Sequence, residues 1–211
     1  MRTNFYIDGF NLYYLALKGT LYKWLDLYLL CQYLTPVHQV NRIRYFTTLV
    51  QARKRNIRRP VRQTMYLRAL ETIPGLTIHY GQFRDRRKFR PLVNLIPGHP
   101  RTVEIWDSEE KGTDVNLASY LLMDGVDQDY EQAVVISNDV DLALPISMVR
   151  DKLGLPTGIV NPNLDSRAYT PKELTDSATF VRRLRPNTLR NCQFPPQLQD
   201  SIGIITKPAD W

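Results

Sequence analysis

The chain has 211 residues, 43% of them hydrophobic, and a formal net charge of +7. This length allows one domain with a sizeable core, and the composition excludes an intrinsically disordered chain. No apolar run reaches the roughly 18 residues that a membrane span needs, and we expect no secretory leader at the N-terminus. The two cysteines, Cys31 and Cys192, form no C-x-x-C pair, so we expect ordinary thiols in a reducing cytoplasm.

The expected secondary structure alternates between strands and helices over the first 160 residues. We expect strands at 3–7, 42–49, 76–83, 102–106, 133–137, 157–160 and 178–184. We expect helices at 11–17, 25–34, 61–70, 113–124 and 142–153. This alternation predicts an α/β fold with a mostly parallel sheet flanked by helices.

Three segments do not fit the alternating pattern. Residues 51–59 are a basic loop, and residues 84–100 are a basic stretch with Pro and Gly that we expect to form a hairpin or a loop. Four prolines follow Arg185 and predict an extended tail. We therefore divide the chain into a main domain at 1–185 and a tail at 186–211.

The positive charge is concentrated in one part of the chain. Residues 27–103 contain fifteen Lys and Arg against two acids, a local charge of +13, whereas residues 104–211 carry −7. Because the planar fork of Arg matches phosphate oxygens, this pattern favours a nucleic-acid partner over a solvated face that only aids solubility. The side chains that we expect to contact phosphate are Arg55, Arg58, Arg59, Arg86 and Arg87.

Four aspartates lie where a parallel sheet would bring them together. Asp8 directly follows the first strand, Asp139 and Asp141 follow the strand at 133–137, and Asp114 opens the helix at 113–124. Sheets of this type bind ligands at the carboxyl ends of their strands. Carboxylates that converge repel one another unless a cation neutralises them, and hard divalent ions prefer oxygen ligands. The pattern therefore predicts a site for Mg²⁺ or Mn²⁺.

Each of these acids also has a purely structural interpretation. Asp8 could form an Asx turn, Asp114 could complement the positive end of its helix, and Asp141 could cap the helix at 142–153. Such a role is least expected for Asp139, because a carboxylate directly after a buried strand faces the cleft. Glu110 lies four residues before Asp114 and is a candidate fifth acid.

Three sequence motifs resemble those of the NYN domain family, the LabA-like group. Residues 5–12, FYIDGFNL, resemble the start of these domains; residues 111–115, KGTDV, resemble the family's K-G-x-D-V segment; and residues 136–142, ISNDVDL, resemble S-[GN]-D-x-D-[LF]. The motifs occur in family order across residues 3–160. The resemblance implies a PIN-like, Rossmann-like fold and metal-dependent cleavage of RNA.

The resemblance also implies roles for individual positions. Asp8, Asp114 and Asp139 would bind the metal, Asp141 would bind it or support the ligands, and Asn11 would steady Asp8 or a metal-bound water. Ser137 and Asn138 would shape the approach to the metal, and Lys111 would contact the acids or a substrate phosphate. The family commonly has Gly where this chain has Asn138, a mild departure because Asn tolerates positive φ.

These features together predict a metal-dependent endoribonuclease that hydrolyses RNA phosphodiester bonds through an Asp cluster with one or two Mg²⁺ or Mn²⁺ ions. One alternative is a non-catalytic RNA-binding or regulatory module with the same fold. Another is a HAD-type phosphohydrolase on a small metabolite, which needs a D-x-D pair where this chain has Asp8-Gly9-Phe10. The sequence leaves a homodimer open.

Overall fold

The structure, a computed structural model, describes residues 1–211 except 52–56, 95–97, 99 and 166. Its centre is a six-stranded sheet in the order β3-β2-β1-β6-β7-β8, and all of its strands are parallel. The strands are β1 (Arg2–Asp8), β2 (Gln39–Thr47), β3 (Leu76–Tyr80), β6 (Gln132–Ile136), β7 (Thr157–Asn161) and β8 (Phe180–Arg183). The order reverses between β1 and β6, and ligands bind doubly wound sheets at the carboxyl end of such a reversal. The predicted α/β fold with a mostly parallel sheet is confirmed.

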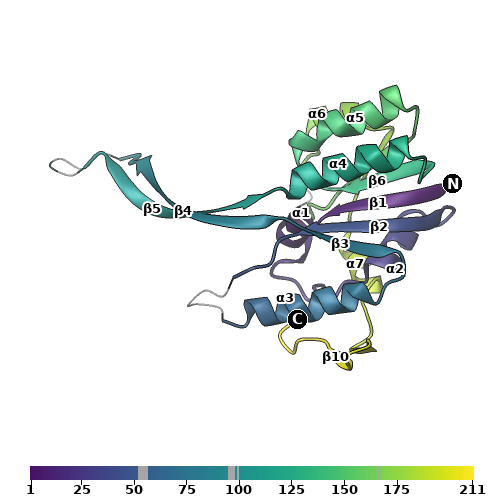
Figure 1. Ribbon diagram of the computed structural model, residues 1–211, viewed down its shortest axis with the longest axis horizontal. Helices are drawn as coiled ribbons and strands as arrows, with labels where there is room; N and C mark the ends of the chain where they lie inside the picture. Colours follow the sequence, from purple (N-terminus) through teal and green to yellow (C-terminus); the bar gives the residue numbers. More distant parts are fainter. Residues whose placement is uncertain (52–56, 95–97, 99, 166) are drawn as a thin grey trace.

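Helices cover both faces of the sheet (Figure 1). One face carries α4 (Thr113–Val126), α5 (Ala143–Lys152) and α6 (Lys172–Ser177), and the other carries α2 (Leu27–Leu34), α3 (Arg59–Glu71) and α7 (Pro186–Asn191). Side chains along β1 alternate between the two cores, because Phe5 and Ile7 pack on the α2–α3 side and Tyr6 on the α4–α5 side. Within the described residues, no helix combines the length and apolarity needed to cross a membrane.

The turn after β1 is helical but irregular. The helix expected at 11–17 is present as a single α turn, α1 (Gly9–Leu12), followed by a π-helical turn, η1 (Tyr13–Leu17). The Lys18 N–H donates to the Tyr13 carbonyl at 2.7 Å, which is the bond of the wider turn. The helix expected from residue 142 starts with a 3₁₀ turn, η2 (Val140–Leu142).

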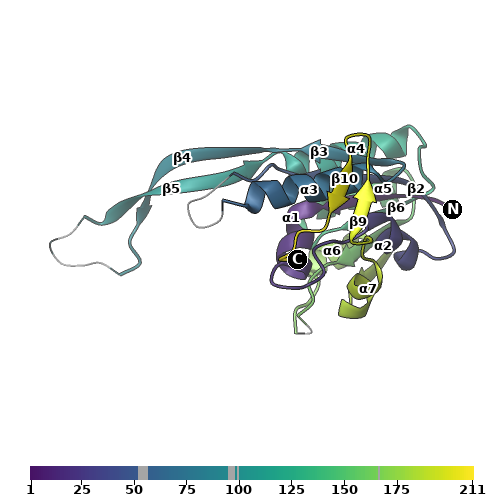
Figure 2. The same ribbon diagram turned by 90° about the horizontal axis from the view of Figure 1, so that it is seen from below.

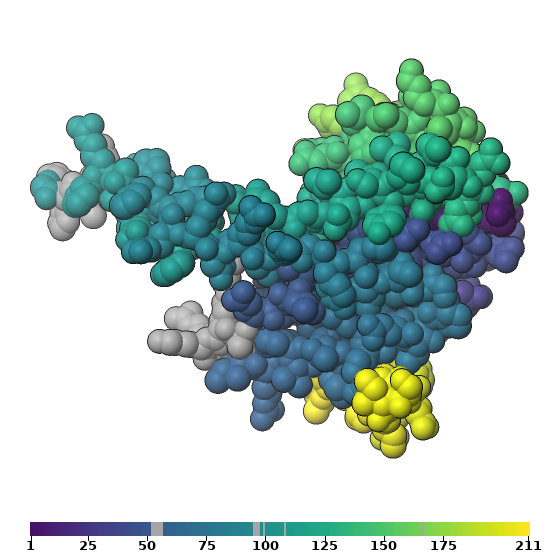
Figure 3. Space-filling view, in the orientation of Figure 1, coloured from purple at the N-terminus to yellow at the C-terminus, as the bar shows by residue number. Residues whose placement is uncertain are grey.

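The basic stretch around residue 90 forms a long two-stranded arm. The strand expected at 76–83 ends at Tyr80, and β4 (Gln82–Pro91) then pairs antiparallel with β5 (Thr102–Lys111) as a sheet of its own. Figures 1, 2 and 3 show this arm projecting from the body. The hairpin expectation for 84–100 is therefore confirmed, but the strand expected at 102–106 is longer and does not join the central sheet.

The C-terminal segment has more structure than the extended tail expected from its prolines. It forms α7 and a hairpin of β9 (Gln197–Gln199) and β10 (Ile204–Thr206). Leu189, Phe194 and Ile205 are buried in the core beneath the sheet, and the Trp24 indole N–H donates to the Pro195 carbonyl at 2.8 Å. Pro186 occupies the first turn of α7, where its missing N–H costs no hydrogen bond.

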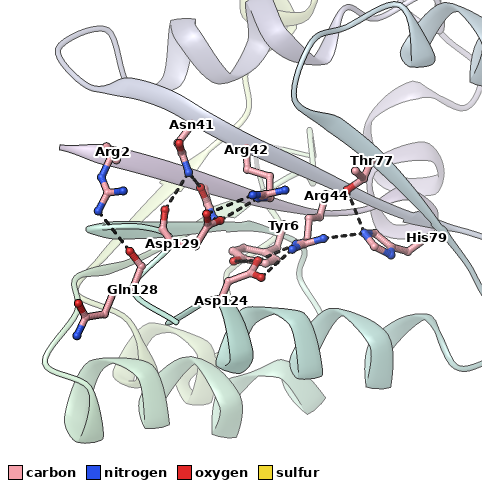
Figure 4. A network of polar contacts seen from close by, with 11 residues as sticks. Arg2, Tyr6, Asn41, Arg42, Arg44, Thr77, His79, Asp124, Gln128 and Asp129 are labelled. Atoms are coloured by element: carbon pink, nitrogen blue, oxygen red, sulfur yellow. Dashed lines mark hydrogen bonds and ion pairs between the residues drawn. The ribbon is translucent and has the colours of Figure 1, made fainter. Parts of the chain in front are cut away.

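A buried polar network fixes α4 against the sheet (Figure 4). Asp124 of α4 accepts hydrogen bonds from the Tyr6 hydroxyl and from Nε and Nη2 of Arg44, each at 2.7 Å. The Arg44 guanidinium also lies 4.3 Å from the ring centroid of Tyr120 on the same helix. These contacts hold the C-terminal half of α4, the helix that begins beside Asp114, against β1 and β2.

Candidate active site

Asp8 is held rigidly at the end of β1. It has the same orientation as Tyr6 along the strand, so it faces the α4 side of the sheet. The side chain of Asn11 donates to Asp8 Oδ2 at 2.7 Å, the Asn11 backbone N–H donates to Oδ1 at 2.9 Å, and the Ser137 hydroxyl donates to Oδ2 at 3.0 Å. Asp8 thus caps α1 and also lies in the predicted site, so the structural interpretation and the functional one are compatible.

The turn after β6 continues this network. The Asn138 N–H donates to Asn11 Oδ1 at 3.2 Å, and the Asp139 N–H donates to the Ser137 hydroxyl at 3.1 Å. The Asp141 N–H in turn donates to Asp139 Oδ1 at 3.0 Å, so Asp139 caps η2. The capping role considered for Asp141 is wrong, because the N-cap of α5 is Leu142, without a side-chain cap, and Asp141 is exposed. Asp139, for which a structural role was least expected, has one as the cap of η2.

Asp114 reaches the site by an unexpected route. The strand before it, β5, belongs to the arm, so Asp114 is placed by the first turn of α4 and by Gly112, whose φ of 96° suits glycine. Burial, followed in order of size by the negative charges of Asp8, Asp139, Glu110 and Asp141, raises the pKa of Asp114 to about 6. Burial also raises the pKa of Asp8, although hydrogen bonds from Asn11 and Ser137 oppose the rise.

The chemistry of these side chains fits a hard divalent cation. All four aspartates offer oxygen, and no described Lys or Arg forms an ion pair with any of them. In the part of the chain that the structure describes, however, no three acidic, histidine or cysteine side chains form a ready metal site. The carboxylates are therefore close enough to interact electrostatically, but they do not form a complete set of metal ligands.

Glu110 and Lys111 lie on the last residues of β5 and not in a loop. Glu110 Oε1 accepts from the Thr48 hydroxyl at 3.2 Å and from the Thr113 N–H at 3.3 Å, which places the carboxylate beside Asp114. Lys111 Nζ instead lies 3.5 Å from Glu109 Oε2, and among the described ion pairs it has none with the four aspartates. Glu110 is thus the fifth acid at this site, whereas Lys111 faces the arm.

The arginines expected to contact phosphate are dispersed. Arg86 pairs with Glu109 at 2.7 Å and Arg87 with Glu104 at 3.5 Å, both across the arm. Arg58 is exposed at the start of α3, and Arg59 Nη2 donates to the Tyr14 hydroxyl at 3.0 Å. Arg55 lies outside the described residues.

A cavity of about 460 Å³ opens between α1, η1 and α3, and none of the four aspartates lines it. Gly9 and Phe10, which directly follow Asp8, form part of its wall. Its aromatic lining consists of Phe10, Tyr13, Tyr14, Tyr45, Tyr66 and Trp211. Nothing in the sequence indicates that the C-terminal Trp211 would join this lining.

The raised pKa of Asp114 predicts how stability depends on pH. In the metal-free protein, the proton held by folded Asp114 contributes stability that is fully present below the unfolded value of 3.8 and is lost as pH rises through about 6. Thermal melting in EDTA should therefore show wild-type protein losing stability between pH 4 and 7, in part through this residue. Asp114→Asn should lose less over this interval, whereas Asp176→Asn, at an exposed acid on α6, should follow wild type. Parallel profiles for wild type and Asp114→Asn would contradict the coupling.

A sequence model of the NYN domain matches residues 2–184. This chain belongs to the NYN domain family. The match includes all three motifs and every residue of the carboxylate network, so the resemblance seen in the sequence is confirmed. It also leaves the HAD-type alternative without support.

Two further proteins are similar to this NYN protein. The 6-hydroxy-3-succinoylpyridine 3-monooxygenase HspA of Pseudomonas putida is 29% identical, with 100% of this chain and 75% of that protein covered. The crystal structure of VPA0982, a protein of unknown function from Vibrio parahaemolyticus, superposes with a TM-score of 0.54 at 13% identity, covering 88% of this chain and 94% of the other. The second likeness shows a shared fold only.

Proposed function

We propose that this NYN protein is a metal-dependent endoribonuclease. The observation that supports the proposal most is that Asp8, Asp114 and Asp139 come from three distant segments to the reversal point of the sheet, where burial and the neighbouring negative charges raise the pKa of Asp114 to about 6. A protein keeps such an unfavourable arrangement of charges where a cation or a developing positive charge offsets it.

The residues divide into ligands and supports. Asp8, Asp114 and Asp139 would hold Mg²⁺ or Mn²⁺, with Asp141 and Glu110 beside them. A bound ion of this kind supplies a nucleophilic water and neutralises charge on the phosphate. Asn11 and Ser137 donate to Asp8, which favours the ionised form of its carboxylate and fixes its orientation. Asn138 and Asp139 are fixed by the same network, which preorganises the site before substrate binds.

RNA is the proposed substrate because residues 27–103 carry a local charge of +13 and contribute Arg59 and Arg62 to the wall of the cavity that Gly9 and Phe10 also line. The arm contributes less to this attraction than its arginines suggest, since residues 82–111 contain seven bases and five acids. A phosphate would have to compete with Glu109 for Arg86 and with Glu104 for Arg87. The more available cations lie near α3 and the cavity. The proposal places the enzyme in the cytoplasm, where the free, buried thiols of Cys31 and Cys192 would remain reduced.

Cleavage of an end-labelled RNA by the purified protein tests the proposal. We expect products with Mg²⁺ or Mn²⁺ and none with EDTA. RNA that binds but stays intact under all metal conditions would favour the alternative of a non-catalytic RNA-binding module.

A second candidate function is oxidation of a small aromatic acid, favoured by the similarity to HspA over the whole of this chain and by the aromatic cavity whose wall includes Gly9 and Phe10. Incubation of the protein with 6-hydroxy-3-succinoylpyridine, dioxygen and an electron donor distinguishes the two candidates. Loss of the pyridine without RNA cleavage would replace the nuclease proposal.

Metal binding should raise the melting temperature. An ion that binds only the folded state at about 100 times its dissociation constant adds roughly 2.7 kcal/mol to the free energy of unfolding. For a domain of this size that corresponds to about 5–10 °C. Differential scanning fluorimetry with EDTA and with Mn²⁺ measures the shift, and Asp139→Asn is the control that should reduce it. Identical curves at millimolar Mn²⁺ would argue against a metal site.

A further inference from the structure

The aromatic cavity has the features of a ligand site. Its volume of about 460 Å³ lies within the range of small-molecule pockets. Tyr14 is 46% exposed although it belongs to the wall, and its ring is nearly parallel to that of Phe10, with 6.3 Å between centroids and 11° between planes. The two rings therefore contribute a continuous aromatic part of the cavity wall.

The backbone of the wall is unusual in the same place. Tyr13, Tyr14 and Leu17 line the cavity from η1, the π-helical turn. Such π-helical turns are rare in proteins overall, because the wider turn is less favourable than an α-helical one. Those that do occur are frequently found at functional sites. Gly9 adds a second constraint, since a Cβ there would lie 2.7 Å from the Tyr45 hydroxyl. The chain thus allows Tyr45 to lie directly against the residue that follows Asp8.

The charges around the cavity are mostly positive. Lys18, Lys23, Arg59 and Arg62 line it, and Asp210 is the acid in the lining, paired with Arg62. Lys18 Nζ lies 4.9 Å from the ring centroid of Tyr14, and neither Lys18 nor Lys23 takes part in an ion pair among the described residues. A ligand that fits both wall and charge is a planar aromatic ring carrying an anionic group.

We propose that this cavity binds one nucleotide of the substrate, with the base against Phe10 and Tyr14 and its phosphate near Lys18 and Arg59. The choice of a nucleotide over another aromatic anion rests on the nuclease function proposed above. Since Gly9 and Phe10 of the wall directly follow Asp8, a base held against Phe10 anchors the strand near that carboxylate. The cavity then determines where along the RNA the cut is made.

Isothermal titration with mononucleotides in EDTA tests this site without any cleavage. Adenosine and uridine monophosphates should bind, and ribose 5-phosphate, which lacks a base, should bind at least about tenfold more weakly, because stacking of a base on an aromatic side chain is worth that much. Tyr14→Ala should weaken mononucleotide binding by about tenfold for the same reason. Tyr33→Ala is the matched control: Tyr33 is 53% exposed, lies on α2 and is not part of the cavity wall.

The outcomes separate this inference from the nuclease proposal. Mononucleotide binding that is lost in Tyr14→Ala and kept in Asp139→Asn supports the site, even if the protein cuts no RNA. Metal-dependent cleavage with no mononucleotide binding, and with the same KM in Tyr14→Ala as in wild type, overturns the site and leaves the nuclease in place. Equal affinity for ribose 5-phosphate, or tighter binding of pyridine-3-carboxylate than of either nucleotide, also overturns it.

Discussion

Asp139→Asn should lower the rate of RNA cleavage by at least about a hundredfold, because it removes charge from a proposed metal ligand while leaving its shape. The structure explains why the fold should survive. Asp139 Oδ1 accepts the Asp141 N–H at 3.0 Å, and an amide oxygen can accept the same bond. The cap of η2 is then retained, and the loss concerns the carboxylate alone. Initial rates on a labelled RNA at saturating Mg²⁺ measure it.

Asp26→Asn is the matched control for this substitution. Asp26 Oδ1 accepts the N–H of Tyr28, two residues ahead, at 2.8 Å, so it has the same capping geometry at the start of α2 and no place in the site. Both variants should melt close to wild type, and only Asp139→Asn should lose activity. Wild-type rates for Asp139→Asn, or an equal loss in both variants, would remove Asp139 from the proposed chemistry.

Much of the carboxylate site could be predicted from the sequence because it depends on local rules. Asp8 and Asp139 directly follow buried strands, and neighbouring parallel strands end at the same edge. The position of Asp114 could be predicted less well from the sequence, because β5 is not part of the central sheet. The helix α4 is held against the sheet by the contact between Asp124 and Arg44 instead. No spacing rule in the sequence predicts the contact between Arg44 and Asp124, which are 80 residues apart.

The arm and the C-terminal segment show where local patterns are insufficient. The basic run at 84–90 gives no hint that Glu104, Asp107 and Glu109 neutralise much of it, since that depends on the register of β4 with β5. The prolines of the last 26 residues predicted an extended chain, yet burial of Leu189 and Ile205 organises it. Trp211 consequently packs on Trp24 and Tyr66 and completes a cavity that no motif indicates.

Asp124→Ala should cost about 3–5 kcal/mol of the free energy of unfolding, the usual effect of removing one partner from a buried ion pair. The side chains of Arg44 and Asp124 are only 11% and 9% exposed, and the substitution leaves the guanidinium without its carboxylate. The buried Tyr6 hydroxyl loses its acceptor as well. For a domain of this size the loss corresponds to a fall in melting temperature of roughly 10 °C.

Asp129→Ala provides the comparison that isolates burial as the cause. Asp129 accepts two hydrogen bonds from Arg42, at 2.8 and 3.2 Å, and one from Asn4, so its bonding resembles that of Asp124 (Figure 4). The Arg42–Asp129 side chains are 37% and 28% exposed, so water can solvate the guanidinium that the substitution leaves behind. The buried Asn4 amide loses one acceptor, and the expected total cost is about 1–2 kcal/mol, below that of Asp124→Ala. Urea unfolding of both variants gives the two values. Equal losses would mean that the network contributes through hydrogen-bond number and not through burial of charge, and the placement of α4 would need another explanation.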